Sequence, residues 1–130
     1  MEGEMIVFAE RLCPSICAQN PTALVVFGDN LLGAGKAGQA CIRDEPNAFG
    51  VPTKKAPSML ENAFFRDEEE FIKLVKSKLD FLWEEHKRGR TIILPRQRIG
   101  TGLARLKEYS PKIDRLIAKF WEAAEKERGK

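Results

Sequence analysis

The sequence predicts an α/β domain, in which helices cover a β-sheet. Residues 22–27 form an unbroken apolar run with two valines, which is typical of a strand buried on both faces. Residues 67–86 and the segment after Ser110 carry apolar side chains at helical spacing. Strands that alternate with helices favour a layered α/β arrangement, and a length of 130 residues corresponds to one domain spanning residues 1–130.

The shorter elements follow from local signals. We expect, in chain order, a short strand at residues 5–9, a helical turn at 14–20, a short helix at 37–43, a short strand or extended segment at 48–51 and a strand at 92–94. Residues 59–66 show no clear pattern. Pro95 ends the last of these strands, since proline cannot donate a ladder hydrogen bond.

Helix-end signals bound the two long helices. Asp67 is expected to cap the first helix, three glutamates occupy its first turn, and Gly89 ends it. Ser110 is expected to cap the final helix, with Pro111 at its first position.

Two glycine-rich loops directly follow predicted strands. The run 22–27 stops at Gly28-Asp29-Asn30 and leads into a glycine loop at residues 28–36, and the strand 92–94 leads into Ile99-Gly100-Thr101-Gly102-Leu103. Glycines let a phosphate approach the backbone, and ligands of α/β sheets bind beyond the carboxyl ends of the strands. We therefore expect the loops to form opposite walls of one nucleotide-shaped cleft; the alternative is a pair of tight turns that need positive φ.

Two common nucleotide motifs are excluded. Residues 33–38 match G-x-G-x-x-G, but the acidic residue required about 20 positions later is replaced by Thr53, Lys54 and Lys55. Ala34 follows Gly33 where a P-loop requires lysine in its pattern. Neither a dinucleotide-dependent dehydrogenase nor a P-loop enzyme is expected, and no cofactor is predicted.

Composition is that of an ordinary globular protein. Hydrophobic residues make up 43% and charged residues 32%, and the net charge of +3 permits an anionic ligand without requiring nucleic acid. There is no apolar run of membrane length, and the acidic start at residues 1–4 is unlike a secretory leader. We expect a cytoplasmic protein with no membrane partner.

The three cysteines are expected to be free thiols. Cys13, Cys17 and Cys41 are an odd set in a chain without an export signal. The spacing of Cys13 and Cys17 does not fit a zinc site, so no metal is predicted.

The single histidine and the two adjacent lysines at positions 54 and 55 are candidate functional groups. His86 lies among charged residues on a helix and is expected on the solvated surface, which excludes Ser–His and Cys–His chemistry. Lys54 and Lys55 follow a predicted strand end, where at least one can contact a phosphate or ribose; the alternative is two surface charges.

Three motifs in the same order resemble the macrodomain family, whose members bind ADP-ribose. They are Leu32-Gly33-Ala34-Gly35, Val51-Pro52-Thr53-Lys54-Lys55, and the segment from Pro95 to Leu106. The closest branch is the compact one containing the terminal ADP-ribose protein glycohydrolase. The resemblance implies a three-layer α/β/α fold with a mixed central sheet and ADP-ribose in the cleft, the first loop on the distal ribose and the second on the diphosphate.

The resemblance also assigns roles to single residues. Lys54 matches the lysine that attacks the anomeric carbon in that branch, whereas the catalytic aspartate of the branch is replaced by Ala104. Asp29 is the candidate substitute acid or base. The expected ligand-binding residues are Gly28, Asn30, Leu32, Gly33, Gly35, Thr53, Ile99, Gly100, Thr101, Gly102 and Leu103.

The sequence thus predicts a protein that binds ADP-ribose or a related nucleotide, with hydrolysis of an ADP-ribosyl bond left open. The partner is expected to be that nucleotide, free or carried on an ADP-ribosylated protein or nucleic acid. The alternative is a nucleic-acid or protein interaction module without catalysis. It would use a basic surface of Lys54, Lys55, Arg96, Arg98 and Arg105.

Overall fold

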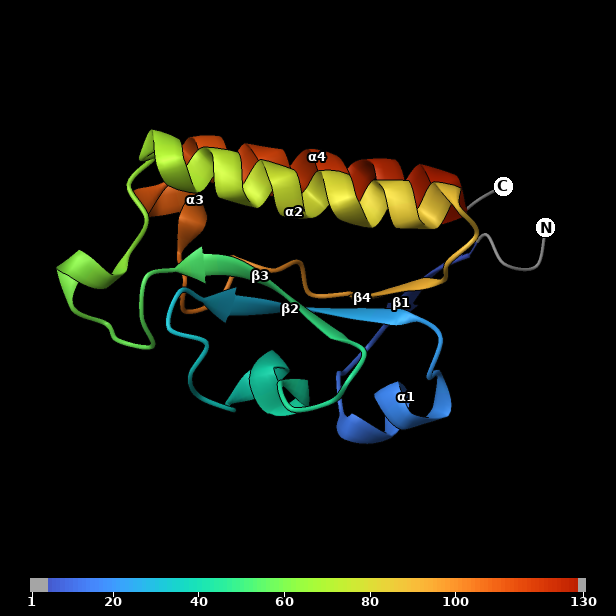
Figure 1. Cartoon of the computed structure of the whole chain (residues 1–130). Helices are drawn as coiled ribbons and strands as arrows, with labels where there is room; N and C mark the ends of the chain where they lie inside the picture. The colour runs from blue at the N-terminus through green and yellow to red at the C-terminus, as the bar shows by residue number, and fades with distance from the viewer. Residues whose placement is uncertain (1–4, 129–130) are drawn as a thin grey trace.

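A four-stranded sheet forms the centre of the computed structural model, which describes residues 5–128; the acidic start at residues 1–4 and residues 129–130 lie outside it. The strands are β1 (Ile6–Ala9), β2 (Leu24–Asn30), β3 (Ala48–Lys54) and β4 (Ile92–Pro95), in the spatial order β1-β4-β2-β3 (Figure 1). The α/β class is therefore confirmed.

The expected mixed sheet is wrong for the described residues, because all three strand pairings are parallel. Every strand is joined to the next by a connection that contains helix, and such crossovers return the chain in the same direction. The one antiparallel contact outside the strands is an isolated bridge between Lys54 and Phe64.

Helices lie on both faces of this sheet. The long helices α2 (Glu69–Lys87) and α4 (Pro111–Arg128) run side by side over one face, and α1 (Pro14–Gln19) lies on the other with the 3-10 helix η1 (Gly38–Ile42) (Figure 1). Two short elements, η2 (Glu61–Ala63) and α3 (Leu106–Tyr109), lie in the connections. No helix within residues 5–128 is long and apolar enough to cross a membrane.

Strand β2 is buried on both faces, as its apolar run predicts. Val26 packs in the core beneath α2 and α4, whereas Val25 and Phe27 pack in the second core around Cys17 and Ile42. Alternate side chains of one strand thus serve two cores.

β2 and β3 extend further than the sequence predicts. β2 continues through Gly28, Asp29 and Asn30, because these residues pair with β3, with a register shift between Asp29 and Asn30. β3 continues through Pro52, which an edge strand tolerates. Residues 28–30, which the sequence predicts to lie in a loop, are therefore part of the sheet at the carboxyl end of β2.

Asp67 does not cap the helix that follows it. It has φ 63°, and its Oδ1 atom accepts hydrogen bonds from the backbone N–H groups of Lys112 and Ile113 at the start of α4. The Ser110 hydroxyl donates to the same oxygen at 2.7 Å and accepts from the Asp67 N–H at 3.0 Å. The expected cap is corrected: Asp67 caps α4 and joins it to the start of α2.

The expected exposure of His86 is also wrong. Its side chain is buried against Trp83, and its Nε2 atom lies 3.6 Å from Glu127 Oε1 on α4. The charged neighbours in sequence point elsewhere on the helix, and α4 covers the histidine. This places the group far from any glycine loop.

Candidate functional site

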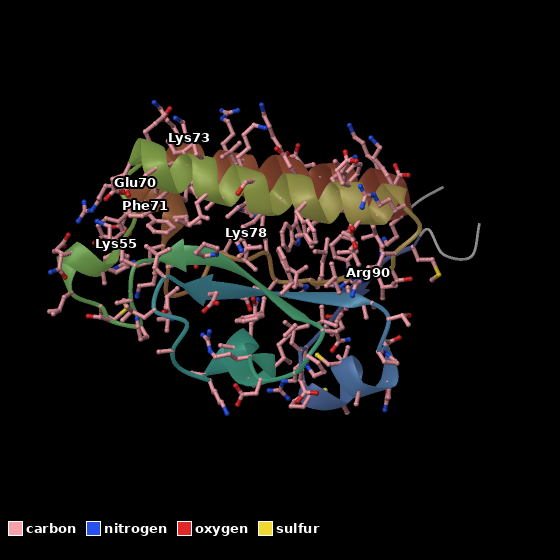
Figure 2. The ribbon with its side chains drawn as sticks, in the orientation of Figure 1. Lys55, Glu70, Phe71, Lys73, Lys78 and Arg90 are labelled. Carbon is pink, nitrogen blue, oxygen red and sulfur yellow. The ribbon has the colours of Figure 1, made fainter. Side chains whose placement is uncertain are left out.

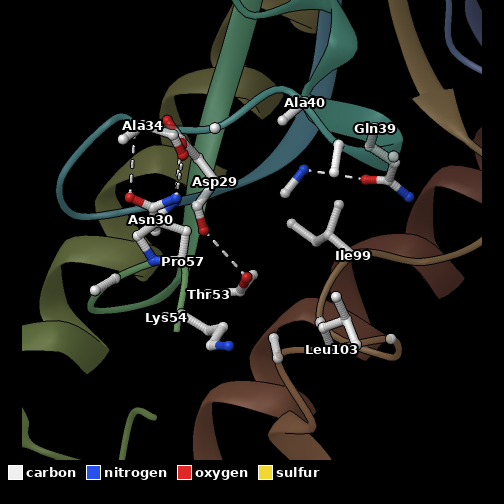
Figure 3. A pocket seen from close by; sticks show the side chains of 18 of the residues that line it. Asp29, Asn30, Ala34, Gln39, Ala40, Thr53, Lys54, Pro57, Ile99 and Leu103 are labelled. Atoms are coloured by element: carbon white, nitrogen blue, oxygen red, sulfur yellow. Dashed lines mark hydrogen bonds between the residues drawn. The ribbon is translucent and has the colours of Figure 1, made fainter. Parts of the chain in front are cut away.

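One pocket lies beyond the carboxyl ends of β2, β3 and β4, with a cavity volume of about 430 Å³ (Figure 3). Its lining includes parts of both glycine loops, so these loops face one common space. The expected residues that line it are Gly28, Asp29, Asn30, Gly35, Thr53, Lys54, Ile99, Gly100, Gly102 and Leu103. We name residues 28–43 the first wall and residues 97–104 the second wall; residues 53–59 complete the pocket.

Three expected binding residues do not line the pocket. Leu32 and Gly33 lie at the outer turn of the first loop, and Leu32 is 69% exposed. Thr101 is exposed, and its hydroxyl donates to the Arg98 carbonyl at 2.7 Å, which stabilises the second wall from outside. The glycine spacing locates the loops but does not tell which of their residues turn outward.

Several lining residues were not among the binding or catalytic residues that the sequence predicts. They are Ala34, Ala37, Gly38, Gln39, Ala40, Arg43, Ala56, Pro57, Ser58, Met59, Gln97, Arg98 and Ala104. Gln39 is the most informative, because it joins the walls: its Oε1 accepts from the Gly28 N–H at 3.1 Å and its Nε2 donates to the Gln97 carbonyl at 3.0 Å. Both partners of Gln39 are backbone groups of other elements, so its local sequence carried no signal of this contact.

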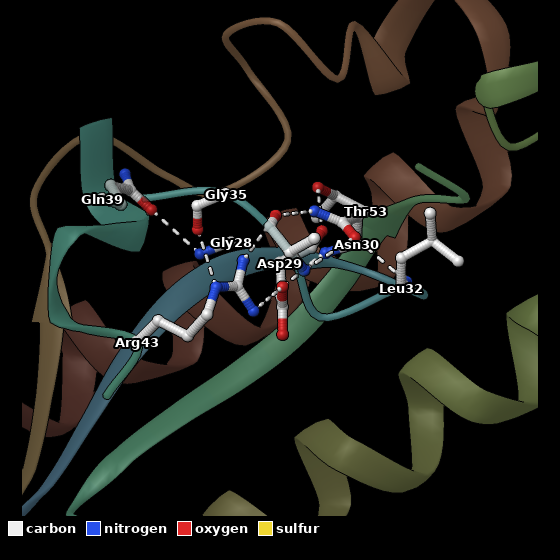
Figure 4. Close-up of polar contacts among 9 residues, drawn as sticks. Gly28, Asp29, Asn30, Leu32, Gly35, Gln39, Arg43 and Thr53 are labelled. Atoms are coloured by element: carbon white, nitrogen blue, oxygen red, sulfur yellow. Dashed lines mark hydrogen bonds and ion pairs between the residues drawn. The ribbon is translucent and has the colours of Figure 1, made fainter. Parts of the chain in front are cut away.

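Asn30 braces the first loop from within (Figure 4). Its side-chain nitrogen donates to the Ala34 carbonyl at 2.8 Å, and its Oδ1 accepts from the N–H groups of Leu32 and Ala34 at 3.0 and 3.4 Å. Asparagine suits this position because its amide can mimic a backbone turn. Its polar atoms are used within the loop.

Unpaired backbone donors remain in both walls. Within the described chain, the N–H groups of Gly35 and Gly102 make no hydrogen bond, whereas the Gly35 carbonyl accepts from Arg43 Nε at 2.7 Å. An unpaired N–H group beside a carbonyl that is already occupied offers a donor to a ligand. That polarity suits an anion such as a phosphate.

Lys54 is the buried cation of the pocket. Its side chain is nearly enclosed, and Nζ lies 4.6 Å from the centre of the Phe64 ring, donating to the Ser58 carbonyl and contacting Met59 Sδ at 3.4 Å. Burial lowers the pKa of Lys54 below its ordinary value of 10.5. A desolvated lysine is a better nucleophile than an exposed one.

Lys55 takes no part in the pocket. Its Nζ lies 2.6 Å from Glu68 Oε2 and 5.6 Å from the centre of the Phe71 ring, at the start of α2 (Figure 2). The cationic neighbour anticipated for Lys54 therefore points elsewhere, and burial alone accounts for the lowered Lys54 pKa.

The other basic residues of the anticipated interaction surface are paired with acidic residues. Arg96 pairs with Glu10, Arg98 with Asp114 at 2.9 Å, and Arg105 with Glu108 at 3.3 Å. Such pairs leave less positive charge for a polynucleotide than the sequence alone indicates.

The three cysteines are free thiols on the α1 side of the sheet. Burial raises the pKa of Cys17, whereas a hydrogen bond with the Ser15 hydroxyl lowers the pKa of Cys13. Among residues 5–128, no group of three or more His, Cys, Asp and Glu side chains is arranged to hold a metal ion.

Comparison with known proteins shows the family. Residues 7–120 match the model of a family of unknown function, DUF7831, so the chain belongs to that family. No curated protein matches the chain. No solved structure matches it either.

Proposed function

We propose that this protein binds ADP-ribose or a related nucleotide in the pocket between the two walls. The observation that carries the proposal is that both glycine loops, far apart in sequence, line one pocket at the carboxyl edge of a parallel sheet. That edge is where α/β sheets bind their ligands, and the cavity is within the size range of small-molecule sites.

The chemistry of the lining supports an anionic ligand. Gly35 and Gly102, whose N–H groups make no hydrogen bond within the described chain, line the pocket in opposite walls, and Lys54 adds a positive charge to the lining. Donors on both sides suit a diphosphate, which presents oxygens in several directions. The apolar side chains of Ile99 and Leu103 offer contact to a ribose or base.

A macrodomain-like three-layer arrangement is part of the same proposal. Helices on both faces of the sheet, with the glycine loops at its carboxyl edge, are compatible with it. The parallel four-stranded sheet would then be a reduced version of the mixed sheet of the macrodomain family.

Hydrolysis of an ADP-ribosyl bond is the second candidate function, and the burial of Lys54 favours it. A lysine of lowered pKa can attack an anomeric carbon. Against hydrolysis, Ala104 lines the pocket where the related branch has an aspartate. Asp29 is an acid that lines the pocket, but its carboxylate is paired with Arg43. We therefore favour nucleotide binding over hydrolysis of an ADP-ribosyl bond as the function of this pocket.

A pair of neighbouring substitutions tests the binding site. Gly102→Val adds a branched side chain at a residue that lines the pocket, and a Cβ there meets only Gln97 Nε2, at an ordinary contact distance of 3.8 Å. Thr101→Val is the control, because Thr101 lies outside the lining.

We expect Gly102→Val to weaken ADP-ribose binding in calorimetry by about tenfold or more, and Thr101→Val to change it by less than about threefold. Equal affinities of the two variants would show that the second wall does not form part of the ADP-ribose site. For turnover, release of ADP-ribose from a modified protein should stop in Lys54→Ala; an unchanged rate would end that role for Lys54.

A further inference from the structure

Asp29 and Arg43 form a largely buried ion pair behind the first loop (Figure 4). Arg43 lies directly after η1 and Asp29 near the end of β2, and Arg43 Nη1 is 2.7 Å from Asp29 Oδ1. The side chains are 14% and 18% exposed. The pair thus joins the start and the end of the first wall.

The remaining donors of Arg43 hold the glycine loop itself. Nε donates to the Gly35 carbonyl at 2.7 Å, Nη2 donates to the Ala34 carbonyl at 3.1 Å, and the guanidinium lies 5.4 Å from the centre of the Phe27 ring. One planar group therefore contacts a strand, a loop and the core. Only the forked guanidinium can make these three contacts together, and lysine cannot.

Asp29 is fixed just as firmly. Its Oδ1 also accepts from the Asn30 N–H at 2.7 Å, and its side chain lies over Gly50 of β3, where a Cβ would come within 2.5 Å of Asp29 Oδ2. Gly50 thus provides the space that the carboxylate occupies. Two donors, the Arg43 guanidinium and the Asn30 N–H, thus hold the Asp29 carboxylate in place.

We propose that Asp29 and Arg43 are positioning residues, which hold the first loop in the conformation that lines the pocket and leaves the Gly35 N–H turned to the ligand. This rests on the proposed nucleotide binding, and it replaces the acid or base role expected for Asp29. A loop that is already ordered costs less to bind than a loop that must first be ordered, so affinity depends on a pair that need not touch the ligand.

The first test compares three variants of the full chain in hydrogen exchange without ligand and in calorimetry with ADP-ribose. Arg43→Met removes all three polar contacts, and Arg43→Lys keeps the charge but not the fork. Lys36→Met is the matched control, because Lys36 forms an exposed ion pair with Asp44 beside the same loop.

We expect the hydrogen-bonded amides of residues 31–34 to exchange about tenfold faster in Arg43→Met, and ADP-ribose affinity to fall by about tenfold, since a competent fraction reduced to a tenth raises the apparent Kd tenfold. Arg43→Lys should lie close to Arg43→Met, and Lys36→Met close to the natural protein. Amides of β2 and β4 serve as an internal check that the fold is intact.

Gly50→Ala breaks the same pair without removing a charge. The added methyl group displaces Asp29, and we expect the exchange of the amides of residues 31–34 to rise as in Arg43→Met. A loop with natural exchange rates in both Arg43→Met and Gly50→Ala would overturn the positioning role.

The outcomes separate the two proposals. If the natural protein does not bind ADP-ribose, the proposed function fails, while the exchange rates still decide whether the pair holds the loop. If binding is intact and Arg43→Met binds ADP-ribose as tightly as the natural protein, the positioning role fails and the proposed function stands.

Discussion

The two walls of the pocket have similar glycine-rich sequences but are held by different forces. The first wall is fixed by side chains that hydrogen bond to its backbone, mainly Asn30 and Arg43. The second wall is fixed mainly by packing, since Ile99 and Ala104 are buried and Leu106 fills the space beside Gly100. Gln39 joins the two across the pocket.

This difference shows that a glycine loop can be ordered in two ways. Hydrogen bonds from fixed side chains order the first loop while it stays exposed to solvent. Packing buries Ile99, Gly100 and Ala104 of the second wall and connects its shape to the stability of the core. We expect the loss of a side chain that holds the first wall to reduce binding more than stability, and overlap with the packed part of the second wall to reduce stability.

The largest effect is expected at Gly100. Its φ is +87°, and a Cβ there would overlap Leu106 Cδ1 and lie 3.0 Å from Leu106 Cγ, so Gly100→Ala should lower the free energy of unfolding by about 3 kcal/mol. The matched change in the first wall is Gly38→Ala, which has φ +59° but no atom within 4 Å of the added carbon. It should cost only about 1 kcal/mol. Urea unfolding measures both, and equal costs would contradict packing as the force in the second wall.

Next in size is the effect of Asn30→Ala on binding. Loss of its three contacts frees the first loop, so affinity for ADP-ribose should fall by about tenfold with little change in the urea midpoint. Thr101→Ala removes one hydroxyl contact from the second wall and should alter affinity by less than about twofold. Calorimetry of the two variants measures both affinities. A larger loss of affinity in Thr101→Ala than in Asn30→Ala would refute the prediction.

A smaller effect is expected from Lys54→Met. The burial that lowers the Lys54 pKa destabilises the fold while the lysine is charged in both states, so the variant should be more stable than the natural protein at neutral pH. As pH rises from the native pKa towards 10.5, the native state loses its proton before the unfolded state does, and the natural protein becomes relatively more stable.

The gain of Lys54→Met should therefore shrink as pH rises from 7 towards 10.5. Urea unfolding across that range measures it, with Lys36→Met correcting for the loss of one exposed positive charge. A gain that grows with pH would contradict the burial of a charged lysine.

Local pattern was enough to predict the α/β class and the strand that carries the site. The apolar run before Gly28 predicts a strand buried on both faces without knowledge of distant contacts, because a strand with apolar side chains on both faces needs a core on each face. The sharing of one pocket by the loops followed from the geometry of parallel strands.

Features that depend on distant contacts could not be predicted. Strand direction, the pairing of Asp67 with the start of α4 and the burial of His86 all depend on segments more than 40 residues away. The bracing of the loop by Arg43 could not be predicted for a different reason. The carbonyls that it contacts lie only eight and nine residues away, but a basic residue after a short helix carries no sequence signal that its donors reach backbone carbonyls.

The most direct test of the account is calorimetric titration of the natural protein with ADP-ribose, with AMP and NAD as comparison ligands. Donors on both walls should hold a diphosphate that carries an unblocked distal ribose. We therefore expect micromolar affinity for ADP-ribose and binding at least about tenfold weaker for AMP and NAD. No heat with ADP-ribose, or equal affinity for all three ligands, would contradict the assignment of this pocket to ADP-ribose.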